Sequence, residues 1–460
     1  MNVINRNAPD FDIIVCGGGM VGATVAALLA TDVTLKGLRI ALIESQSSQP
    51  PGDEVDVRVS AISRASERIL ARCGAWPLIK SSQRCAYQDM VVWDHASPAP
   101  NLQSKHVHGE LLSVRTGEPF NNLTRNPSAS SGRTALSPEG LIARPEALHF
   151  SAASMAESNL GYIIANNCIQ WAALEAGAQT GVTRFATRLS SIKLDDVRAC
   201  VQLDDGRSIT AHLVIGADGA RSISRECVGI AANIKPYQQS ALVMHIRTEW
   251  PHQFTAWQRF LSNGPIALLP LNDGRSSIVW TTMPDHADHL LKLNDAQLAN
   301  EIGNACDHVL GQVTIAGARA AFPLQLAQVD EYCRARFVLV GDAAHSIHPL
   351  AGQGVNLGLM DAASLVQVLS EAREHGASMQ ALSEMRVLRG YERWRKTENT
   401  IALSMVDGIN RLFSNDSTLL SKARRIGLQT VERHSLIKRF FMSRALGIGG
   451  DAPRMASHTG

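Results

Sequence analysis

A glycine-rich turn between two apolar segments near the N-terminus restricts the possible fold more than any other feature of the chain. Residues 11–15 are almost entirely apolar, as in a strand buried within a parallel sheet, and residues 17–22 spell Gly-Gly-Gly-Met-Val-Gly. An alanine-rich helical pattern over 23–30 and a second apolar segment, 39–43, follow in that order. The sequence therefore predicts a β-α-β unit, the framework of a doubly wound α/β domain.

The glycine spacing in this unit matches the G-x-G-x-x-G fingerprint of dinucleotide-binding proteins. Gly17 permits the tight turn, Gly19 lets a pyrophosphate approach the backbone, and Gly22 lets the helix pack closely on the strand. Glu44 ends the second strand about 20 residues further on, where a carboxylate can bind the ribose of adenosine. Strand, fingerprint, helix, strand and acid in this order favour a nucleotide site over an ordinary glycine-rich turn.

A second strand-to-helix turn stands near residue 341. The apolar segment 336–340 leads into Gly341 and Asp342, and a long helical pattern begins near residue 354. A carboxylate at this strand end can accept a hydrogen bond from the ribityl chain of a flavin, and backbone N–H groups at the helix start can stabilise negative charge on its ring. The residues expected to supply those N–H groups are Gly352, Gln353, Gly354, Val355 and Asn356.

A third apolar segment, 213–215, ends in an acidic turn that contains Asp218 and Gly219. Two cationic side chains, Arg221 and Arg225, follow directly. Alone, this stretch would be an ordinary strand-end turn. Between the other two motifs, it is expected to contribute a further strand and a further cofactor contact to the nucleotide domain.

These three motifs, in this order, resemble those of class A flavoprotein aromatic hydroxylases, and in particular the ubiquinone-biosynthesis hydroxylases of bacteria and mitochondria. The resemblance covers nearly the whole chain outside one insert. The runs 392–396 and 445–451 are most similar to the subgroup that hydroxylates ring carbon 5 of 2-polyprenylphenols. Further family-like stretches are 56–63, 74–76, 161–164, 169–170, 256–260, 264–270, 321–324 and 391–397.

The resemblance implies an α/β fold in which a Rossmann-like FAD-binding domain of the aromatic hydroxylase type is interleaved with a β-sheet substrate domain and followed by C-terminal helices. Residues 97–147, rich in proline and serine, are expected to form a long, mostly disordered surface loop; partner docking is the alternative. The expected FAD-binding segments are 1–84, 161–226 and 336–379, the sheet segments are 85–160 and 227–335, and the helical region is 380–460.

The resemblance also implies noncovalent FAD, NADPH or NADH as reductant, and O2 as co-substrate. Hydroxylation would proceed through a flavin hydroperoxide that an electron-rich phenol attacks, so the protein binds the flavin, excludes water and orients the ring. His348 and Pro349, beside the flavin, are the catalytic candidates: Pro349 would also contact the cofactor, and His348 is either a base for the phenol proton or a structural residue. Arg221 and Arg225 are candidates for docking the nicotinamide donor.

Further candidates are less specific. Arg58 and Gln170 would contact the cofactor by analogy with relatives, with a surface cation as the alternative for Arg58. A substrate pocket is expected at Trp257, Phe260 and Pro270, although aromatic residues in a sheet are often ordinary core.

Composition excludes several other classes of function. With 44 Lys and Arg against 42 Asp and Glu, no overall field recruits nucleic acid. The eight cysteines include no C-x-x-C pair, so neither a disulfide framework nor a metal site is expected. No apolar segment is long enough to span a bilayer and no signal peptide is apparent, which predicts a cytoplasmic protein. The basic, amphipathic stretch 422–446 could still lie on the inner membrane face, or simply pack on the fold.

The expected function is therefore an FAD-dependent aromatic-ring monooxygenase that acts on a polyprenylated phenol in ubiquinone biosynthesis, with proteins of a ubiquinone-biosynthesis complex as candidate partners. Two alternatives remain open at this point. One is hydroxylation of a soluble aromatic metabolite, and the other is a catalytically idle, flavin-bound scaffold.

Overall fold

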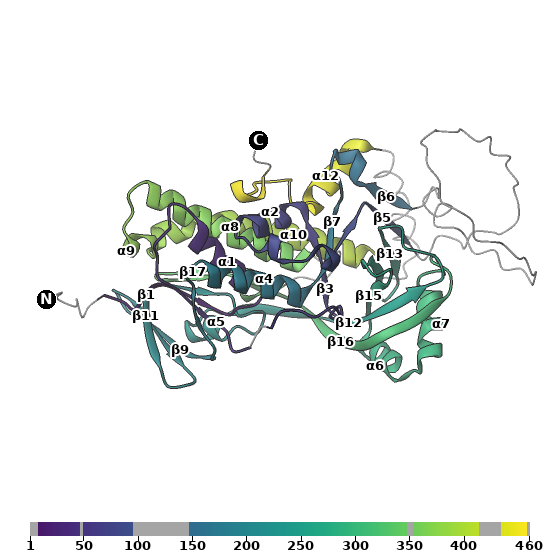
Figure 1. Ribbon diagram of the computed structural model, residues 1–460, viewed down its shortest axis with the longest axis horizontal. Coiled ribbons are helices and arrows are strands. Elements are labelled where there is room, and N and C mark those ends of the chain that lie inside the picture. The colour runs from purple at the N-terminus through teal and green to yellow at the C-terminus, as the bar shows by residue number, and fades with distance from the viewer. Residues whose placement is uncertain (1–7, 47–48, 95–146, 347–352, 414–433, 458–460) are drawn as a thin grey trace, which may run out of the picture.

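The computed structural model describes residues 8–46, 49–94, 147–346, 353–413 and 434–457. The molecule is elongated, with a nucleotide-type sheet and its helices at one end and a second, mainly antiparallel sheet at the other (Figure 1). Most of the expected polar insert, 97–147, and residues 422–433 of the basic stretch lie outside the described residues.

The first sheet is mainly parallel and carries all three turn motifs. Among the described residues its main path is β17-β18-β11-β1-β2-β8, and β10 and β9 extend from β11. The three central strands β18, β11 and β1 are parallel neighbours, so their carboxyl ends meet at one edge of the sheet. The bounds are β1 (Phe11–Cys16), β2 (Ile40–Ile43), β8 (Thr183–Phe185), β9 (Leu189–Leu194), β10 (Ala199–Leu203), β11 (Ser208–Gly216), β17 (Cys333–Arg334) and β18 (Phe337–Leu339).

Helices α1 and α8 pack against each other, and α1 also packs against α4 (Figure 1). Helix α1 is apolar nearly all round, since alanine and leucine dominate it, and it is buried over 22–29. Helix α10 packs on α8. The bounds are α1 (Met20–Thr31), α2 (Arg64–Arg72), α4 (Asn166–Gln179), α5 (Ile223–Cys227), α8 (Gln353–Glu374), α9 (Met379–Leu382), α10 (Met385–Phe413) and α12 (Ser435–Ala445).

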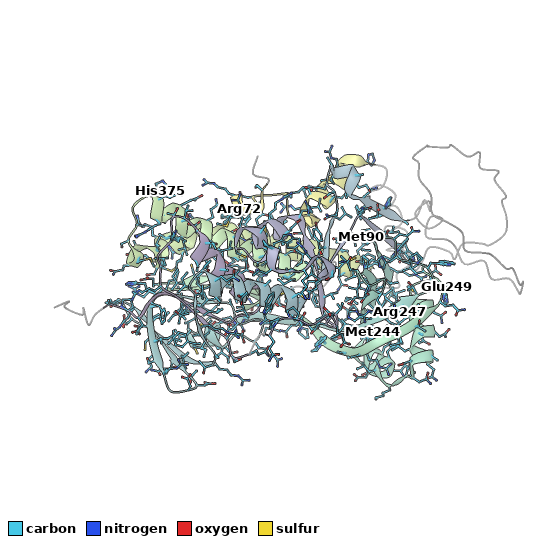
Figure 2. All side chains as sticks on the ribbon, in the orientation of Figure 1. Arg72, Met90, Met244, Arg247, Glu249 and His375 are labelled. Atoms are coloured by element: carbon cyan, nitrogen blue, oxygen red, sulfur yellow. The ribbon has the colours of Figure 1, made fainter. Side chains whose placement is uncertain are left out.

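The second sheet forms a roof whose two faces have different partners. Along β12, Leu242 and Met244 point into an apolar core closed by α6 and α7, while Ala241 and Val243 point toward the nucleotide end. Figure 2 shows Met244 and the exposed Arg247 at this end of the molecule. The sheet order is β19-β16-β12-β15-β14-β13-β5-β6 among the described residues. The bounds are β5 (Asp89–Asp94), β6 (Leu148–Ser151), β12 (Ala232–Thr248), β13 (Thr255–Leu261), β14 (Gly264–Pro270), β15 (Ser276–Thr282), β16 (Val313–Val329), β19 (His345–Ser346), α6 (Pro284–Lys292) and α7 (Asp295–Ala305).

A small antiparallel sheet connects the two ends. It consists of β3 (Val59–Ser63), β7 (Gly161–Ala165) and β4 (Arg84–Tyr87), with β7 in the middle. The chain therefore passes repeatedly between the two ends, as expected for interleaved domains, while the domain boundaries given above stay a prediction. No helix in the described part of the chain is long and apolar enough to cross a bilayer.

Candidate active site

The three glycine-rich turns lie side by side at the carboxyl edge of the parallel sheet. Gly17 has φ +101°, and a β-carbon there would lie 2.6 Å from the carbonyl oxygen of Ala217. A β-carbon on Gly22 would lie only 1.9 Å from the carbonyl oxygen of Gly17, whereas one on Gly19 would meet nothing within 4 Å. Gly17 and Gly22 are therefore required by the fold itself, while Gly19 leaves open space at the N-terminus of α1, where a pyrophosphate binds in such turns.

The backbone on both sides of Gly18 is held by two of the predicted cofactor residues. Its N–H donates to Glu44 Oε2 over 2.7 Å, and its carbonyl oxygen accepts from Gln170 Nε2 over 2.9 Å. Glu44 also accepts a hydrogen bond from the backbone N–H of Gln46. Both side chains thus fix the shape of the fingerprint turn, and the Glu44 carboxylate still has lone pairs for a ribose hydroxyl.

Asp342 is the acid expected to bind the ribityl chain. It lies in the short helical turn 341–343, and its carboxylate faces a cavity although protein atoms surround it on most sides. Burial raises the pKa of Asp342 above its ordinary value, an effect opposed by His345 and Arg58. No hydrogen bond to this carboxylate is present among the described residues. An unpaired carboxylate in such surroundings is suited to accept hydrogen bonds from ligand hydroxyl groups.

The start of α8 is the second polar element of the cavity. Gly354 and Val355 line it, and the helix begins at Gln353, so the first backbone N–H groups have no intrahelical partner. Asn356 fixes this end in place, because its side chain accepts from Ser63 N over 3.0 Å and donates to the carbonyl oxygen of Ala61 over 2.8 Å. The helix N-terminus thus presents partial positive charge to the cavity. The predicted residues His348, Pro349 and Gly352 lie outside the described residues.

The cavity has a volume of about 490 Å³, and the second sheet roofs it with mainly apolar side chains. Gly19, Gly219 and Asp342 lie on its floor side, and Arg58 lies on its wall with the guanidinium carbon 5.3 Å from the centre of the Phe322 ring. Representative residues of the roof are Ala241, Val243, Ala267, Leu269 and Val279. The volume falls in the range of small-molecule sites, and an apolar roof over a few polar groups is typical of them.

A buried network behind the cavity was not predicted from the sequence. Asp361 Oδ2 accepts a hydrogen bond from the backbone N–H of Gly341 over 3.0 Å and lies 2.5 Å from His345 Nε2. Asp361 Oδ1 accepts from Arg395 Nε over 2.8 Å and from Asn399 Nδ2 over 3.0 Å. His345 and Arg395 hold the pKa of Asp361 well below its usual range, against the opposing effect of burial. In the sequence, this network is indicated only by Asp361, an acid within the otherwise apolar run of α8.

The acidic turn after β11 mainly stabilises itself. Asp218 accepts from the hydroxyl groups of Ser222 and Ser224 and from the backbone N–H of Ser224. Arg225 is buried and donates to the carbonyl oxygens of Ala343 and Ala220. Asp218 and Arg225 thus stabilise the turns through these hydrogen bonds, whereas Arg221 is exposed.

The three substrate-pocket candidates lie in different surroundings. Trp257 lines the cavity and contacts Trp93 edge to face, with ring centres 6.4 Å apart. Phe260 packs in a separate apolar cluster with Val406 of α10, and Pro270, at the end of β14, is not among the lining residues. Lining residues that sequence reasoning missed include Asn166, Tyr87 and Met90.

Comparisons with known proteins identify the class. The model of the family described as FAD binding domain matches residues 10–390, and the chain belongs to this family. The fold, the FAD cofactor and the monooxygenase class predicted from the sequence are thereby confirmed. The cradle fits the cofactor, since Gly19 leaves room for a pyrophosphate and Asp342 leaves an acceptor for a ribityl hydroxyl.

Similar proteins include several ubiquinone hydroxylases. The chain is 32% identical to the ubiquinone hydroxylase UbiL of Rhodospirillum rubrum, over 96% of this chain and 92% of that protein. It is 33% identical to the 3-demethoxyubiquinol 3-hydroxylase of Escherichia coli, over 95% and 98% of the two chains. It is 31% identical to the human mitochondrial ubiquinone biosynthesis monooxygenase COQ6, over 94% and 92%.

Solved structures agree at the level of the fold. The p-nitrophenol 4-monooxygenase PnpA of Pseudomonas putida superposes with a TM-score of 0.68 at 18% identity, over 95% of this chain and 98% of that chain. The probable FAD-dependent monooxygenase pqsL of Pseudomonas aeruginosa gives 0.66 at 19% identity, over 91% and 99%. At such identities the likeness establishes the architecture alone.

Proposed function

We propose that this enzyme hydroxylates the aromatic ring of a polyprenylated phenol in ubiquinone biosynthesis, with NADPH or NADH as reductant. The observation that carries the proposal is the meeting of the fingerprint turn, Asp342 and the N-terminus of α8 in one cavity under an apolar roof. Similarity to ubiquinone hydroxylases over nearly the whole chain supports the choice of substrate class. Ring carbon 5 stays a prediction, since a 3-hydroxylase is among relatives of similar identity.

FAD, when bound and reduced, supplies the activation of O2. The protein's own residues bind the cofactor and orient the aromatic substrate. Asp342 would accept a hydrogen bond from a ribityl hydroxyl, and the N–H groups at the start of α8 would stabilise negative charge on the flavin ring. The apolar roof excludes water and offers apolar side chains to an aromatic ring. Tyr87 on the cavity wall stays protonated at neutral pH, because burial raises its pKa to about 12.

Deprotonation of the phenol by a side chain stays a prediction that rests on His348. Among the described residues of the cavity wall, the ionisable side chains are Arg58, Tyr87 and Asp342. Asp342 is committed to the cofactor in this proposal, and neither of the others accepts a proton at neutral pH. Replacement of His348 by Gln should therefore slow hydroxylation more than it weakens substrate binding, if His348 is the base.

Contact with a membrane surface belongs to the same proposal, because a polyprenylated phenol resides in lipid. Helix α12 supports it, because Arg439 is exposed and the adjacent Phe440 is 51% exposed. Binding to other proteins of ubiquinone biosynthesis is proposed only by analogy with the relatives' pathway.

The decisive experiment combines isotope labelling with metabolite profiling. Purified enzyme that contains FAD should oxidise NADPH slowly alone and faster with a prenylated phenol, and ¹⁸O from O2 should appear in the ring hydroxyl. A deletion strain should accumulate the unhydroxylated quinone precursor, whose structure also identifies the ring carbon. Hydroxyl oxygen that comes from water would exclude the monooxygenase reaction, and equal turnover of a tail-free phenol would favour a soluble aromatic substrate instead. A flavin-bound protein that consumes no NADPH with any phenol would be the idle scaffold.

A further inference from the structure

A second cavity lies directly beside the first. It has a volume of about 260 Å³ and shares two wall residues, Tyr87 and Met90, with the cavity described above. Its walls come from β5, β6, α8, α10 and α12, elements on both sides of the junction between the two ends of the molecule. Figure 2 places Met90 at this junction. The two cavities are thus neighbours with a common wall.

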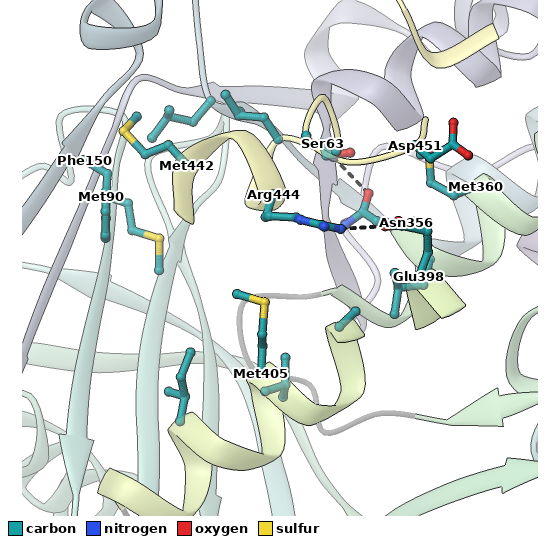
Figure 3. Close-up of a pocket in the computed structure, with 18 of the residues that line it drawn as sticks. Ser63, Met90, Phe150, Asn356, Met360, Glu398, Met405, Met442, Arg444 and Asp451 are labelled. Atoms are coloured by element: carbon teal, nitrogen blue, oxygen red, sulfur yellow. Dashed lines mark hydrogen bonds and ion pairs between the residues drawn. The ribbon is translucent and has the colours of Figure 1, made fainter. Parts of the chain in front are cut away.

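The chemistry of the second cavity is mainly apolar and adaptable. Four methionines line it: Met90, Met360, Met405 and Met442. Figure 3 shows Met90, Phe150, Met405 and Met442 around one part of the cavity and Asp451 away from them. Methionine side chains are flexible and polarisable, so they adjust to an irregular apolar ligand.

The charged groups on this wall are already engaged, apart from the exposed Asp451 at its outer end. Arg444 Nη1 lies 2.5 Å from Glu398 Oε2, and Arg395 is bonded to Asp361 and Asn399. A polar ligand would therefore find few partners in the methionine-lined part. An apolar chain is the ligand class that fits.

We propose that the second cavity binds the ring-proximal isoprenoid units of the substrate's tail while the aromatic ring occupies the first cavity. The proposal rests on the proposed function, which supplies the aromatic head and the apolar tail. Tyr87 and Met90 line both cavities, so the two sites are adjacent, and the proposal has the tail pass between these two side chains. The volume is close to the lower limit of small-molecule sites, which suits a segment of the tail rather than its full length.

Helix α12 forms part of the enclosure. Met442 and Leu446 are buried and line the cavity, and the Arg444–Glu398 pair connects α12 to α10 across it. The turn after α12 covers this pair, since a β-carbon on Gly450 would lie 2.7 Å from Arg444 Nη1. The C-terminal segment thus encloses the tail site, and its sequence contributes directly to the binding of the tail.

The test compares two neighbouring residues on α10. Ala402 lines the second cavity, whereas Ile401 is 38% exposed. Binding to the FAD-loaded enzyme is followed without NADPH, by the change in flavin absorbance, for a tail-free phenol and for the same phenol with a farnesyl tail. In the unaltered enzyme the tail should tighten binding roughly tenfold or more, because apolar surface leaves water. Ala402→Trp should abolish this gain, and Ile401→Trp should keep it.

Both variants should bind the tail-free phenol and FAD as the unaltered enzyme does. If Ala402→Trp does not fold, Met405→Trp, with Ser404→Trp as its exposed control, replaces it. Equal affinity for both phenols in the unaltered enzyme, or a full gain in the cavity variants, would overturn the tail site. A gain that is lost only in the cavity variants, together with no hydroxylation of either phenol, would support the tail site and contradict the proposed function.

Discussion

His345 Nε2 lies 2.5 Å from Asp361 Oδ2, and both side chains are almost completely buried. The pair joins β19, directly after the turn that carries Asp342, to α8, and Arg395 extends the connection to α10. A buried carboxylate is costly unless hydrogen bonds and opposite charges surround it, and Asp361 has both. This arrangement fixes the position of the loop that carries Asp342.

Replacement of Asp361 by Asn should destabilise the protein by about 3–5 kcal/mol, because Arg395 would remain buried without its carboxylate partner. Chemical denaturation of the apoprotein measures the change. Asp53→Asn is the matched control, since Asp53 is fully exposed and its contact with Lys80 is 4.0 Å long. Equal stability of the two variants would mean that the network contributes nothing to folding.

Because of the Asp361 carboxylate, the stability of the protein should decrease at low pH. The folded-state pKa of Asp361 is depressed, so its contribution to stability is complete above its unfolded pKa of about 3.9 and is lost as the pH falls toward the folded value. Unfolding free energy should therefore decline below about pH 4 in the unaltered protein and decline less steeply in Asp361→Asn. Parallel pH profiles of the two proteins would contradict this assignment.

Replacement of Asp342 by Ala should weaken FAD binding roughly tenfold or more, because ligand hydroxyl groups enclosed in the complex would lose an acceptor at a cost of about 1–3 kcal/mol. Titration of the apoprotein with FAD measures the affinity. Asp342→Asn keeps one acceptor oxygen, so its affinity for FAD should lie between that of the unaltered protein and that of Asp342→Ala. Unchanged affinity in Asp342→Ala would remove this residue from the cofactor site.

Substitutions at two glycines of the fingerprint should impair different properties, stability at Gly22 and FAD affinity at Gly19. Gly22→Ala places a β-carbon against the Gly17 carbonyl oxygen, so the apoprotein should lose stability. Gly19→Ala meets no protein atom, so the apoprotein should keep its melting temperature and lose affinity for FAD. Gly52→Ala, also free of close contacts, is the control for both measurements. A Gly19→Ala protein that binds FAD normally would place the pyrophosphate elsewhere.

The Arg444–Glu398 pair should hold α12 only modestly. Both side chains are partly exposed, so Arg444→Ala should cost about 1 kcal/mol or less and increase hydrogen exchange in α12. The exchanged pair Arg444→Glu with Glu398→Arg should recover part of the loss, which a double-mutant cycle quantifies. Additive single changes would show that the two residues do not interact in solution.

The sequence allowed the turns to be predicted because each one is a local pattern. Gly17 and Asp342 follow apolar strands directly, and the chemistry of a strand-end turn depends on residues close in sequence. The roles of Asp361 and Arg395 depend on contacts between α8 and α10, and each residue alone looks like an ordinary helix position. Met405 is similar, since an apolar residue on a helix predicts core and gives no sign of a cavity.

The adjacency of β1, β11 and β18 has a consequence for the order of events during synthesis. The turns that follow them are separated in sequence by roughly 120 to 200 residues, so the cofactor cradle exists only after the start of α8 has been synthesised. A nascent or truncated N-terminal half contains the fingerprint but not Asp342. FAD therefore adds its binding free energy only to the nearly complete chain, and retention of the flavin reports that the distant segments have assembled.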